Sequence, residues 1–424
     1  MVTLTGRASS YFKPKSVRWA GMSTPIVDPQ KLDWLLNHGV EEILPSKEVF
    51  REKLLRGERI RLYYGIDPTG PTIHIGHLIP LMKVAELQEL GHEIIILIGD
   101  FTGMIGDPTD KGATRKQLTR EQVLENCRLY KEQIGHIIKF DGPNAAQLRF
   151  NSDWLAKLSF AEVIELSAHF TVQQMIERDM FEKRIAEGKP VHLHEFFYPL
   201  MQGYDSVALD VDLEVGGNDQ TFNMLAGRTL LREMKNKEKF VMRCRLLTDP
   251  TGKKMGKSEG NMIALTDSPI DAYGKIMSWT DGMIIPGFEI LTKLSQAEVD
   301  ARKARIEAGE NPMVFKRELA ELVVAWAFSA EGAKQAAEHF TQVHQQGERP
   351  EEMTEVKVEE AELPILDLLV RTNIVPSKSE ARRQVEQKAV RVDDVVIEDI
   401  NASIALHDGL VIQKGKRSFV KIIK

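Results

Sequence analysis

The sequence is poor in cysteine and has no long apolar segment, and each absence excludes a class of protein. Among its 424 residues are only two cysteines, Cys127 and Cys244. One pair of thiols cannot stabilise a chain of this length, so we expect a reducing compartment, the cytoplasm. The longest apolar run, around Ile94 to Ile98, is far too short to cross a bilayer. No membrane partner is therefore expected.

The composition is typical of a folded protein of two or three domains, with 42% apolar and 28% charged residues. The net charge of −6 argues against a protein that coats nucleic acid through bulk charge. The charge is unevenly distributed, however. Residues 363–424 hold 11 Lys or Arg and 8 Asp or Glu, a net of +3, whereas the rest of the chain carries −9. Just before this basic segment, Pro350 to Glu362 contain six glutamates and one lysine, which predicts a solvated linker.

The hydrophobic pattern predicts a doubly wound α/β domain with a parallel sheet, followed by smaller domains. The predicted boundaries are a disordered tail at 1–30, the α/β domain at 31–265, an all-helical domain at 266–349, the acidic linker at 350–362 and a small α+β domain at 363–424. The first 25 residues are basic and free of acid, which leaves a transit peptide as an alternative to a loose tail. Met22 is an alternative start.

Strands are expected where β-branched and apolar residues cluster between helical stretches. They are predicted at Arg61–Gly65, Glu93–Gly99, Gln147–Asn151, Asp212–Val215 and Lys239–Leu246. Before them, Leu32, Leu35, Leu36 and Val40 recur at helical spacing. Later helices are expected at 297–309 and 312–344, and in the tail at 365–372 and 377–387, before strands that end at Val420.

Two histidines stand where the first strand passes into a helix. His74 and His77 enclose Gly76, and Pro80 predicts that the helix begins near His77, because proline is tolerated in a first turn. Open α/β sheets bind ligands at the carboxyl ends of their strands, and free helix N–H groups favour phosphate. A phosphate site and a surface loop with two ordinary histidines both fit this pattern.

A lysine-rich segment, Thr251–Ser258, is the second candidate. It is not a P-loop, because Gly252 and Gly256 enclose three residues where that motif needs four. The segment fits a flexible loop whose ammonium groups neutralise a polyphosphate, or else a solvated basic turn.

Further polar residues follow the second strand and lie on one later helix. Asp107 ends a glycine-rich turn and could anchor an ammonium group, with Lys111 and Arg115 close behind. Tyr198, Gln202 and Asp205 share one helical face, either a pocket wall or a solvent-facing stripe. A metal site at His192, His194 and Glu195 lacks a fourth ligand and a convincing spacing, so no metal is predicted.

Together these motifs resemble a known enzyme family. His74-Ile75-Gly76-His77 and Lys254-Met255-Gly256-Lys257-Ser258 are similar to the two signatures of class I aminoacyl-tRNA synthetases. Tyr63…Asp67-Pro68-Thr69, Gly106-Asp107-Pro108, Tyr198…Gln202…Asp205 and Gly217-Asn218-Asp219-Gln220 resemble the bacterial-type tyrosyl-tRNA synthetases. The last 60 residues, with Ser377 to Arg383 on a helix, resemble the S4-type RNA-binding domain of such enzymes.

The resemblance implies a Rossmann-like catalytic domain that activates tyrosine with ATP and Mg²⁺ and transfers it to tRNA(Tyr), without a tightly bound metal or organic cofactor. Catalytic roles fall to Thr69, His74, His77, Lys254, Lys257, Lys111 and Arg115. ATP binding falls to Gly65, Asp67, Gly76, Gly217, Asp219, Met255 and Ser258. Tyrosine binding falls to Tyr63, Asp107, Tyr198, Gln202, Asp205 and Gln220, with Tyr63 and Asp205 on the phenol. RNA binding in the tail falls to Lys378, Arg382 and Arg383.

Several alternatives remain open beside this resemblance. Tyr64 could exchange roles with Tyr63, and a tryptophan-specific enzyme or a catalytically inactive RNA-binding protein are rival interpretations. Gly256 stands where most class I enzymes have serine, and Pro80 where relatives can have a hydroxyl residue near the ribose. The resemblance also implies a homodimer, with the interface predicted between Arg115 and Arg149.

Overall fold

The computed structural model describes residues 24–107, 118–177, 179–248, 262–345, 353–358, 360–415 and 418–424. The chain forms two compact units, residues 1–334 and 335–424. Among the described helices, none combines the length and the apolar character that crossing a bilayer requires.

The first unit is built on a six-stranded sheet in the order β1-β6-β5-β2-β3-β4. Its strands are β1 (Val40–Leu44), β2 (Arg61–Ile66), β3 (Glu93–Ile98), β4 (Gln147–Phe150), β5 (Leu213–Gly217) and β6 (Phe240–Cys244). All neighbours are parallel except β1, which runs antiparallel to β6. The chain builds outward from β2 through β3 to β4, and then returns to the other side of β2. The topological switch point, where open sheets bind ligands, therefore lies beside β2.

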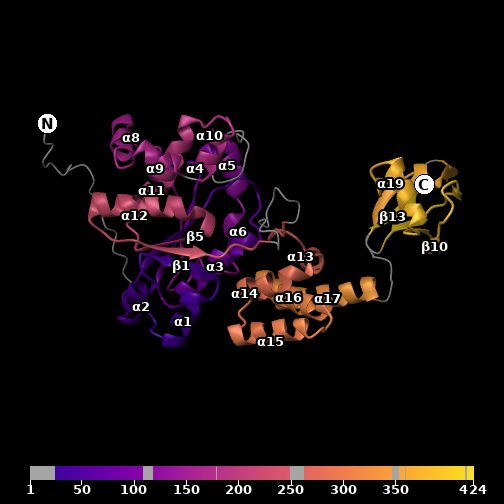
Figure 1. Ribbon diagram of the computed structural model, residues 1–424, viewed down its shortest axis with the longest axis horizontal. Coiled ribbons are helices and arrows are strands. Elements are labelled where there is room, and N and C mark those ends of the chain that lie inside the picture. Colours follow the sequence, from indigo (N-terminus) through magenta and orange to yellow (C-terminus); the bar gives the residue numbers. More distant parts are fainter. Residues whose placement is uncertain are drawn as a thin grey trace. The chain divides into compact units, whose positions relative to one another are not determined.

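Helices cover both faces of this sheet. Helix α3 (Ile75–Glu89) lies on one side, and the paired helices α11 (Phe197–Leu209) and α12 (Thr221–Lys235) lie on the other (Figure 1). The last five residues of β3 are buried, because helices cover the sheet from both sides. The other helices of this part are α2 (Lys47–Leu55), α4 (Thr102–Ile105), α5 (Arg120–Cys127), α6 (Tyr130–Ile134), α7 (Ser152–Leu155), α8 (Phe160–Ser167), α9 (Val172–Ile176) and α10 (Asp179–Ala186), with the 3₁₀ turns η1 (Leu193–Phe196) and η2 (Asn218–Gln220).

The N-terminal segment differs from the prediction in two respects. Helix α1 (Pro29–Asn37) ends before Val40, which begins β1 and pairs with Cys244. The helical spacing of Val40 was misleading, because a distant strand decides its conformation. The tail predicted at 1–30 is also too long, since the Ile26 amide donates to the Leu90 carbonyl at 2.8 Å.

Between residues 266 and 345, all of which the structure describes, the regular elements are helical, as predicted. They are α13 (Pro269–Met277), η4 (Asp281–Met283), α14 (Ile284–Leu291), α15 (Gln296–Glu307), α16 (Pro312–Ala327) and α17 (Ala330–Gln345). The stretch predicted as helical from 312 to 344 divides into two helices at Phe328 and Ser329.

The second unit is a small α+β fold with its own core. Its sheet has the order β10-β9-β12-β13-β7, and β11 pairs with β8. The elements are β7 (Thr354–Lys357), β8 (Glu362–Pro364), α18 (Ile365–Arg371), α19 (Lys378–Glu386), β9 (Val390–Val392), β10 (Val395–Val396), β11 (Ser403–Ala405), β12 (Val411–Lys414) and β13 (Ser418–Ile423).

The acidic segment is not wholly a solvated linker, which corrects the prediction for 350–362. Strand β7 pairs in parallel with β13, and the Val358 side chain is fully buried in the core of the second unit. Val356 and Val358 alternate with charged residues, a strand pattern that the run of glutamates conceals.

Candidate active site

The loop after β2 is held in place by side chains from α5 and α6. Asn126, Tyr130 and Gln133 donate to backbone carbonyls of this loop at 2.9, 2.5 and 2.9 Å; the acceptors are Pro68, Gly70 and Pro71. Gln133 also accepts from the Ile73 amide at 2.7 Å. These three side chains were not predicted, because nothing in their local pattern marks them. They fix the approach to His74.

The two histidines form the start of α3. His74 is the N-cap, and its Nδ1 accepts from the Gly76 amide at 3.2 Å, while His77 Nδ1 accepts from the His74 amide at 3.3 Å. Burial lowers the pKa of His77 to about 4. Its imidazole is therefore neutral at pH 7, with the proton on Nε2. The helix begins at Ile75, two residues before the predicted start, so Pro80 lies in the second turn.

The chain that follows the lysine-rich segment lies against this helix start. The Ile75 amide donates to the Ile263 carbonyl at 2.9 Å, and the Leu265 amide donates to the Ile73 carbonyl at 2.8 Å. Ala264 thereby lies opposite His74 in an antiparallel bridge. The predicted residues Lys254, Met255, Lys257 and Ser258 lie outside the described residues, as do Lys111 and Arg115.

Asp67 joins the ends of β2 and β3 to helix α11. Tyr198 donates its hydroxyl to Asp67 Oδ2 at 2.8 Å, and Thr102 donates to Oδ1 at 2.7 Å. Gly99 leaves room for this arrangement, since a Cβ there would lie 1.9 Å from Asp67 Oδ1. Asp67, predicted to bind ATP, therefore contacts a residue predicted to bind tyrosine.

Asp205 is buried, and two residues that follow the end of β4 donate hydrogen bonds to it. Its Oδ1 accepts from Trp154 Nε1 at 2.7 Å, and its Oδ2 accepts from Asn151 Nδ2 at 3.2 Å. Burial raises the pKa of Asp205 well above its usual range, although both hydrogen bonds oppose this effect. Trp154 and Asn151 were not predicted, but they follow a parallel strand at its carboxyl end, which is a usable signal.

Two more predicted tyrosine-binding residues contact each other. Gln220 Nε2 donates to Asp107 Oδ2 at 2.6 Å, and Gln220 Oε1 accepts from Asn223 at 2.9 Å. Close by, a Cβ at Gly217 would lie 2.5 Å from Asp219 Oδ1, so this turn depends on glycine. The turn brings Asp219 to the carboxyl end of β5.

The two adjacent tyrosines of β2 point to opposite faces of the sheet, as alternation requires. The Tyr63 hydroxyl lies 3.3 Å from Ser206 Oγ and 3.5 Å from the Gln202 carbonyl, both on α11. The Tyr64 ring lies on the other face of the sheet. Burial raises the pKa of Tyr64, and the nearby Cys244 and Asp219 raise it further. Tyr63 is thus the tyrosine on the side of Tyr198, Gln202 and Asp205.

Residues 55–345 match the family described as tRNA synthetases class I (W and Y). The chain belongs to the class I tRNA synthetases. Residues 345–422 match the C-terminal domain described as tyrosine–tRNA ligase SYY-like, which includes the acidic segment. Class I tRNA synthetases use ATP as a substrate. The predicted family and the Rossmann-like fold are confirmed.

Similar proteins span nearly the whole chain. The tyrosine–tRNA ligase of Moorella thermoacetica is 43% identical over 393 residues, which cover 92% of this chain and 94% of that protein. Tyrosine–tRNA ligase 2 of Pseudoalteromonas translucida is 44% identical, covering 91% and 97%. The crystal structure of a C-terminally truncated mitochondrial tyrosyl-tRNA synthetase from Coccidioides posadasii has a TM-score of 0.58 and 25% identity, covering 73% of this chain and 91% of that chain.

The predicted RNA-binding residues of this synthetase lie on α19 of the second unit. Lys378 pairs with Asp367, and Arg383 pairs with Glu380 at 2.7 Å; Arg382 is exposed. These ion pairs are solvent-exposed, so they contribute little to stability.

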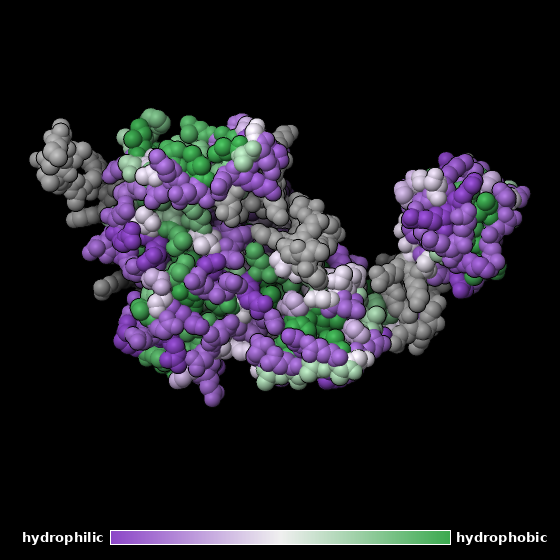
Figure 2. All heavy atoms as spheres, in the orientation of Figure 1, coloured by the Kyte–Doolittle hydropathy of each residue, from purple (hydrophilic) through white to green (hydrophobic). Residues whose placement is uncertain are grey.

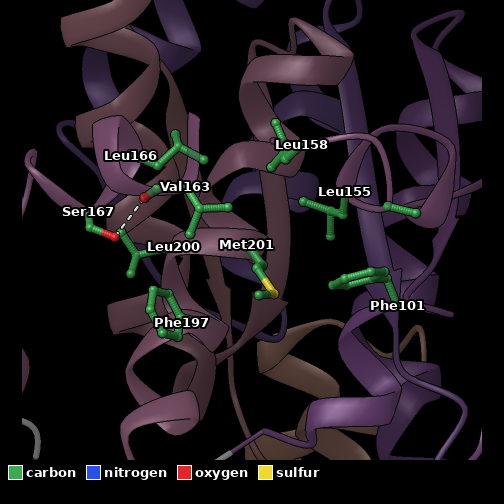
Figure 3. A pocket seen from close by; sticks show the side chains of 10 residues that line it. Phe101, Leu155, Leu158, Val163, Leu166, Ser167, Phe197, Leu200 and Met201 are labelled. Atoms are coloured by element: carbon green, nitrogen blue, oxygen red, sulfur yellow. Dashed lines mark hydrogen bonds between the residues drawn. The ribbon is translucent and has the colours of Figure 1, made fainter. Parts of the chain in front are cut away.

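An apolar cavity of about 180 Å³ lies beside α11, lined by residues such as Phe101, Leu155, Leu166 and Met201 (Figure 3). The Ser167 hydroxyl, which lines the cavity, donates to the Val163 carbonyl at 2.7 Å. Charged substrates would lose their hydration there without gaining partners, so this cavity is not the site. Among the described residues, no group of three His, Cys, Asp or Glu side chains could hold a metal.

Proposed function

We propose that the protein is a tyrosine–tRNA ligase that works in two steps. A carboxylate oxygen of tyrosine attacks the α-phosphorus of ATP, and the bond to pyrophosphate breaks. A ribose hydroxyl at the 3′ end of tRNA(Tyr) then attacks the carbonyl carbon of the adenylate, and AMP leaves. No bond to the protein forms, so its residues act by positioning the reactants and by stabilising charge.

The observation that carries this proposal is the Asp205 carboxylate, which is 2% exposed. Trp154 and Asn151 hold it on the face of the sheet that Tyr63 also occupies. A buried carboxylate is a strong acceptor for the phenol hydroxyl of a tyrosine substrate. Phenylalanine would leave this carboxylate without the third donor that the phenol supplies, at a cost of about 1–3 kcal/mol. The curated relatives above carry the name of this activity.

Tyr198, Asp107 and Gln202 are suited to the ammonium group of the substrate. Tyr198 donates its one hydroxyl proton to Asp67, so its oxygen can face a ligand only as an acceptor. An ammonium group carries donors alone, so it matches this oxygen and the Asp107 carboxylate. Gln220 donates a hydrogen bond to Asp107 and would lie beside the substrate carboxylate.

The helix start of α3 is suited to the nucleotide. Neutral His77 and the backbone at Gly76 would contact the ribose and phosphates, with Gly65, Gly217 and Asp219 on the nucleoside. Thr69 and His74 would bind the phosphates in the transition state. Lys254, Lys257, Lys111 and Arg115 would stabilise the departing pyrophosphate, with Met255 and Ser258 beside them. We assign Mg²⁺ to ATP and the reaction to the cytoplasm.

A homodimer is also part of this proposal. Phe160, Ile164, Val172 and Leu193 are 80, 56, 66 and 72% exposed. Figure 2 shows hydrophobic residues gathered over α8 and the neighbouring helices. Exposed apolar groups of this kind favour association. Leu124 and Leu129, which lie in the segment predicted from the sequence as the dimer interface, are also exposed.

The test is amino-acid-dependent exchange of pyrophosphate into ATP, with tyrosine, tryptophan and phenylalanine compared. Exchange with tyrosine alone is expected. Exchange with tryptophan alone would refute the specificity, and no exchange with any of the three would refute the enzyme. Transfer of the activated amino acid to tRNA(Tyr) tests the second step.

Replacing the donor to Asp205 tests the phenol subsite. Trp154→Phe removes the 2.7 Å hydrogen bond and keeps an aromatic ring, so the KM for tyrosine should rise about tenfold or more. Trp34→Phe is the matched control, because its Nε1 donates at 3.1 Å to Glu86, which lies on α3 away from Asp205. Equal effects of both variants would contradict this assignment.

A further inference from the structure

A buried ion pair lies next to the tyrosine-binding residues. Lys239 is 0% exposed and Glu214 is 2% exposed, and Lys239 Nζ contacts Glu214 Oε2. The same Nζ donates to Ser206 Oγ at 2.8 Å. Burying two opposite charges often stabilises a fold no better than a well-packed apolar pair would. Stability alone therefore does not account for this pair.

The neighbouring helix provides the space that the lysine needs. A Cβ at Gly227 of α12 would lie 2.5 Å from Lys239 Nζ and 2.5 Å from Ser206 Oγ. Glycine inside a helix is less stable than alanine. The helix therefore carries a destabilising residue at the point where the lysine and the serine meet.

Both charges are connected to residues of the proposed tyrosine subsite. Glu214 Oε1 accepts from Gln202 Nε2 at 3.0 Å. Ser206 Oγ, which accepts from Lys239, lies 3.3 Å from the Tyr63 hydroxyl. Lys239 Nζ lies 6.0 Å from the centroid of the Tyr63 ring. The network thus reaches the side chains proposed for both ends of the substrate.

The protonation of Tyr63 agrees with this arrangement. Burial raises the pKa of Tyr63, and the Glu214 and Asp205 charges raise it further. The phenol therefore keeps its proton and can donate to Ser206 Oγ. Burial lowers the pKa of Lys239, an effect that Glu214 opposes.

We propose that Lys239 and Glu214 are positioning residues, which fix the Tyr63 hydroxyl and the Gln202 amide and thereby set the affinity for tyrosine without touching it. Lys239 occupies Glu214 Oε2 and Ser206 Oγ, so that Oε1 is directed to Gln202. Ser206 Oγ also donates to Glu214 Oε2 at 3.5 Å, so without the lysine the carboxylate would draw this hydroxyl closer and away from Tyr63. This inference rests on the proposed tyrosine–tRNA ligase activity.

The decisive variant replaces the ion pair by an apolar pair of similar size, Lys239→Met with Glu214→Met. Replacing a buried ion pair by well-packed apolar residues is often neutral or stabilising, so we expect the double variant to melt no lower than the parent protein. Its KM for tyrosine in pyrophosphate exchange should rise at least about tenfold, while its KM for ATP stays within about twofold. A purely structural pair would leave both values unchanged.

Lys235→Met is the matched control. Lys235 also joins α12 to the end of α11, where it donates to the Val207 carbonyl at 2.7 Å, but neither Tyr63 nor Gln202 is among its hydrogen-bond partners. It should leave the KM for tyrosine within about twofold. A folded double variant with normal tyrosine KM, or an equal rise in the KM for ATP, would overturn the inference. Absence of exchange in the parent protein would instead refute the proposed function.

Discussion

At Gly99, one added methyl group should disrupt two hydrogen bonds of the site. A Cβ there would lie 1.9 Å from Asp67 Oδ1 and 2.4 Å from Thr102 Oγ1. Side-chain carbons rarely approach within 3.0 Å of another heavy atom. In Gly99→Ala the Asp67 carboxylate must therefore move by about 1 Å, given how closely protein interiors are packed.

This displacement affects two hydrogen bonds to one carboxylate, those from Thr102 at 2.7 Å and from Tyr198 at 2.8 Å. Overpacking costs about 1–3 kcal/mol, and a hydrogen bond to a charged group contributes about 1.5–3 kcal/mol. Since relaxation preserves part of these contacts, Gly99→Ala should lose about 2–4 kcal/mol of stability. The loss of Tyr198 orientation should raise the KM for tyrosine at least about tenfold.

Urea unfolding and tyrosine-dependent pyrophosphate exchange measure the two effects. Gly274→Ala in α13 is the control, because a Cβ there meets no heavy atom within 4 Å and alanine favours the helix by up to about 1 kcal/mol. A Gly99→Ala protein as stable as its parent, with the same KM for tyrosine, would refute the steric argument.

Three further predictions concern other parts of the chain. His74→Ala should slow adenylate formation about 100-fold in single-turnover assays, since it removes a phosphate donor, while tyrosine binding measured by equilibrium dialysis stays unchanged. Burial lowers the pKa of His92 to about 4, and Arg59 adds to this effect. The folded protein therefore binds this proton less readily than the unfolded chain does. About 3 kcal/mol of the stability present above pH 6.5 should be lost as the pH falls towards 4. His92→Asn, which keeps an acceptor for the Ile60 amide, should flatten this loss in urea titrations at pH 7, 5.5 and 4. Removing residues 346–424, including the strand β7, should leave pyrophosphate exchange within about twofold but lower tRNA charging at least about tenfold; equal loss of both would show that the second unit supports the catalytic body.

Much of the fold follows from local sequence patterns. The five parallel strands were predicted to within about two residues, although only β2 and β3 carry a strong strand pattern and the other three were predicted from weaker ones. Strand β1 was missed because Val40 continues the spacing of α1, and only pairing with β6 makes it a strand. Strand β7 was missed for a related reason, since its pairing with β13 joins segments far apart in the sequence.

The site shows the same division between local and distant information. The motifs predict which polar residues lie at the carboxyl ends of β2, β3 and β5, but they do not predict the hydrogen bonds among those residues. The resemblance assigns Asp67 to ATP binding, yet Asp67 accepts a hydrogen bond from Tyr198, which lies 131 positions further on. Sequence spacing cannot choose between two nearby subsites, because that choice depends on how α11 packs against the sheet.

Asn151 and Trp154 show where a physical rule could have gone further. Both follow β4, whose carboxyl end adjoins those of β2 and β3, so the rule that located His74 and Asp107 applies equally to them. What conceals them is their chemistry, since an amide and an indole are not groups that carry out a reaction. Their contribution is to hold the buried Asp205 as an acceptor, and this requirement becomes visible only once the carboxylate is known to be buried. Residues that position others can therefore be predicted only after the burial of the groups they serve has been established.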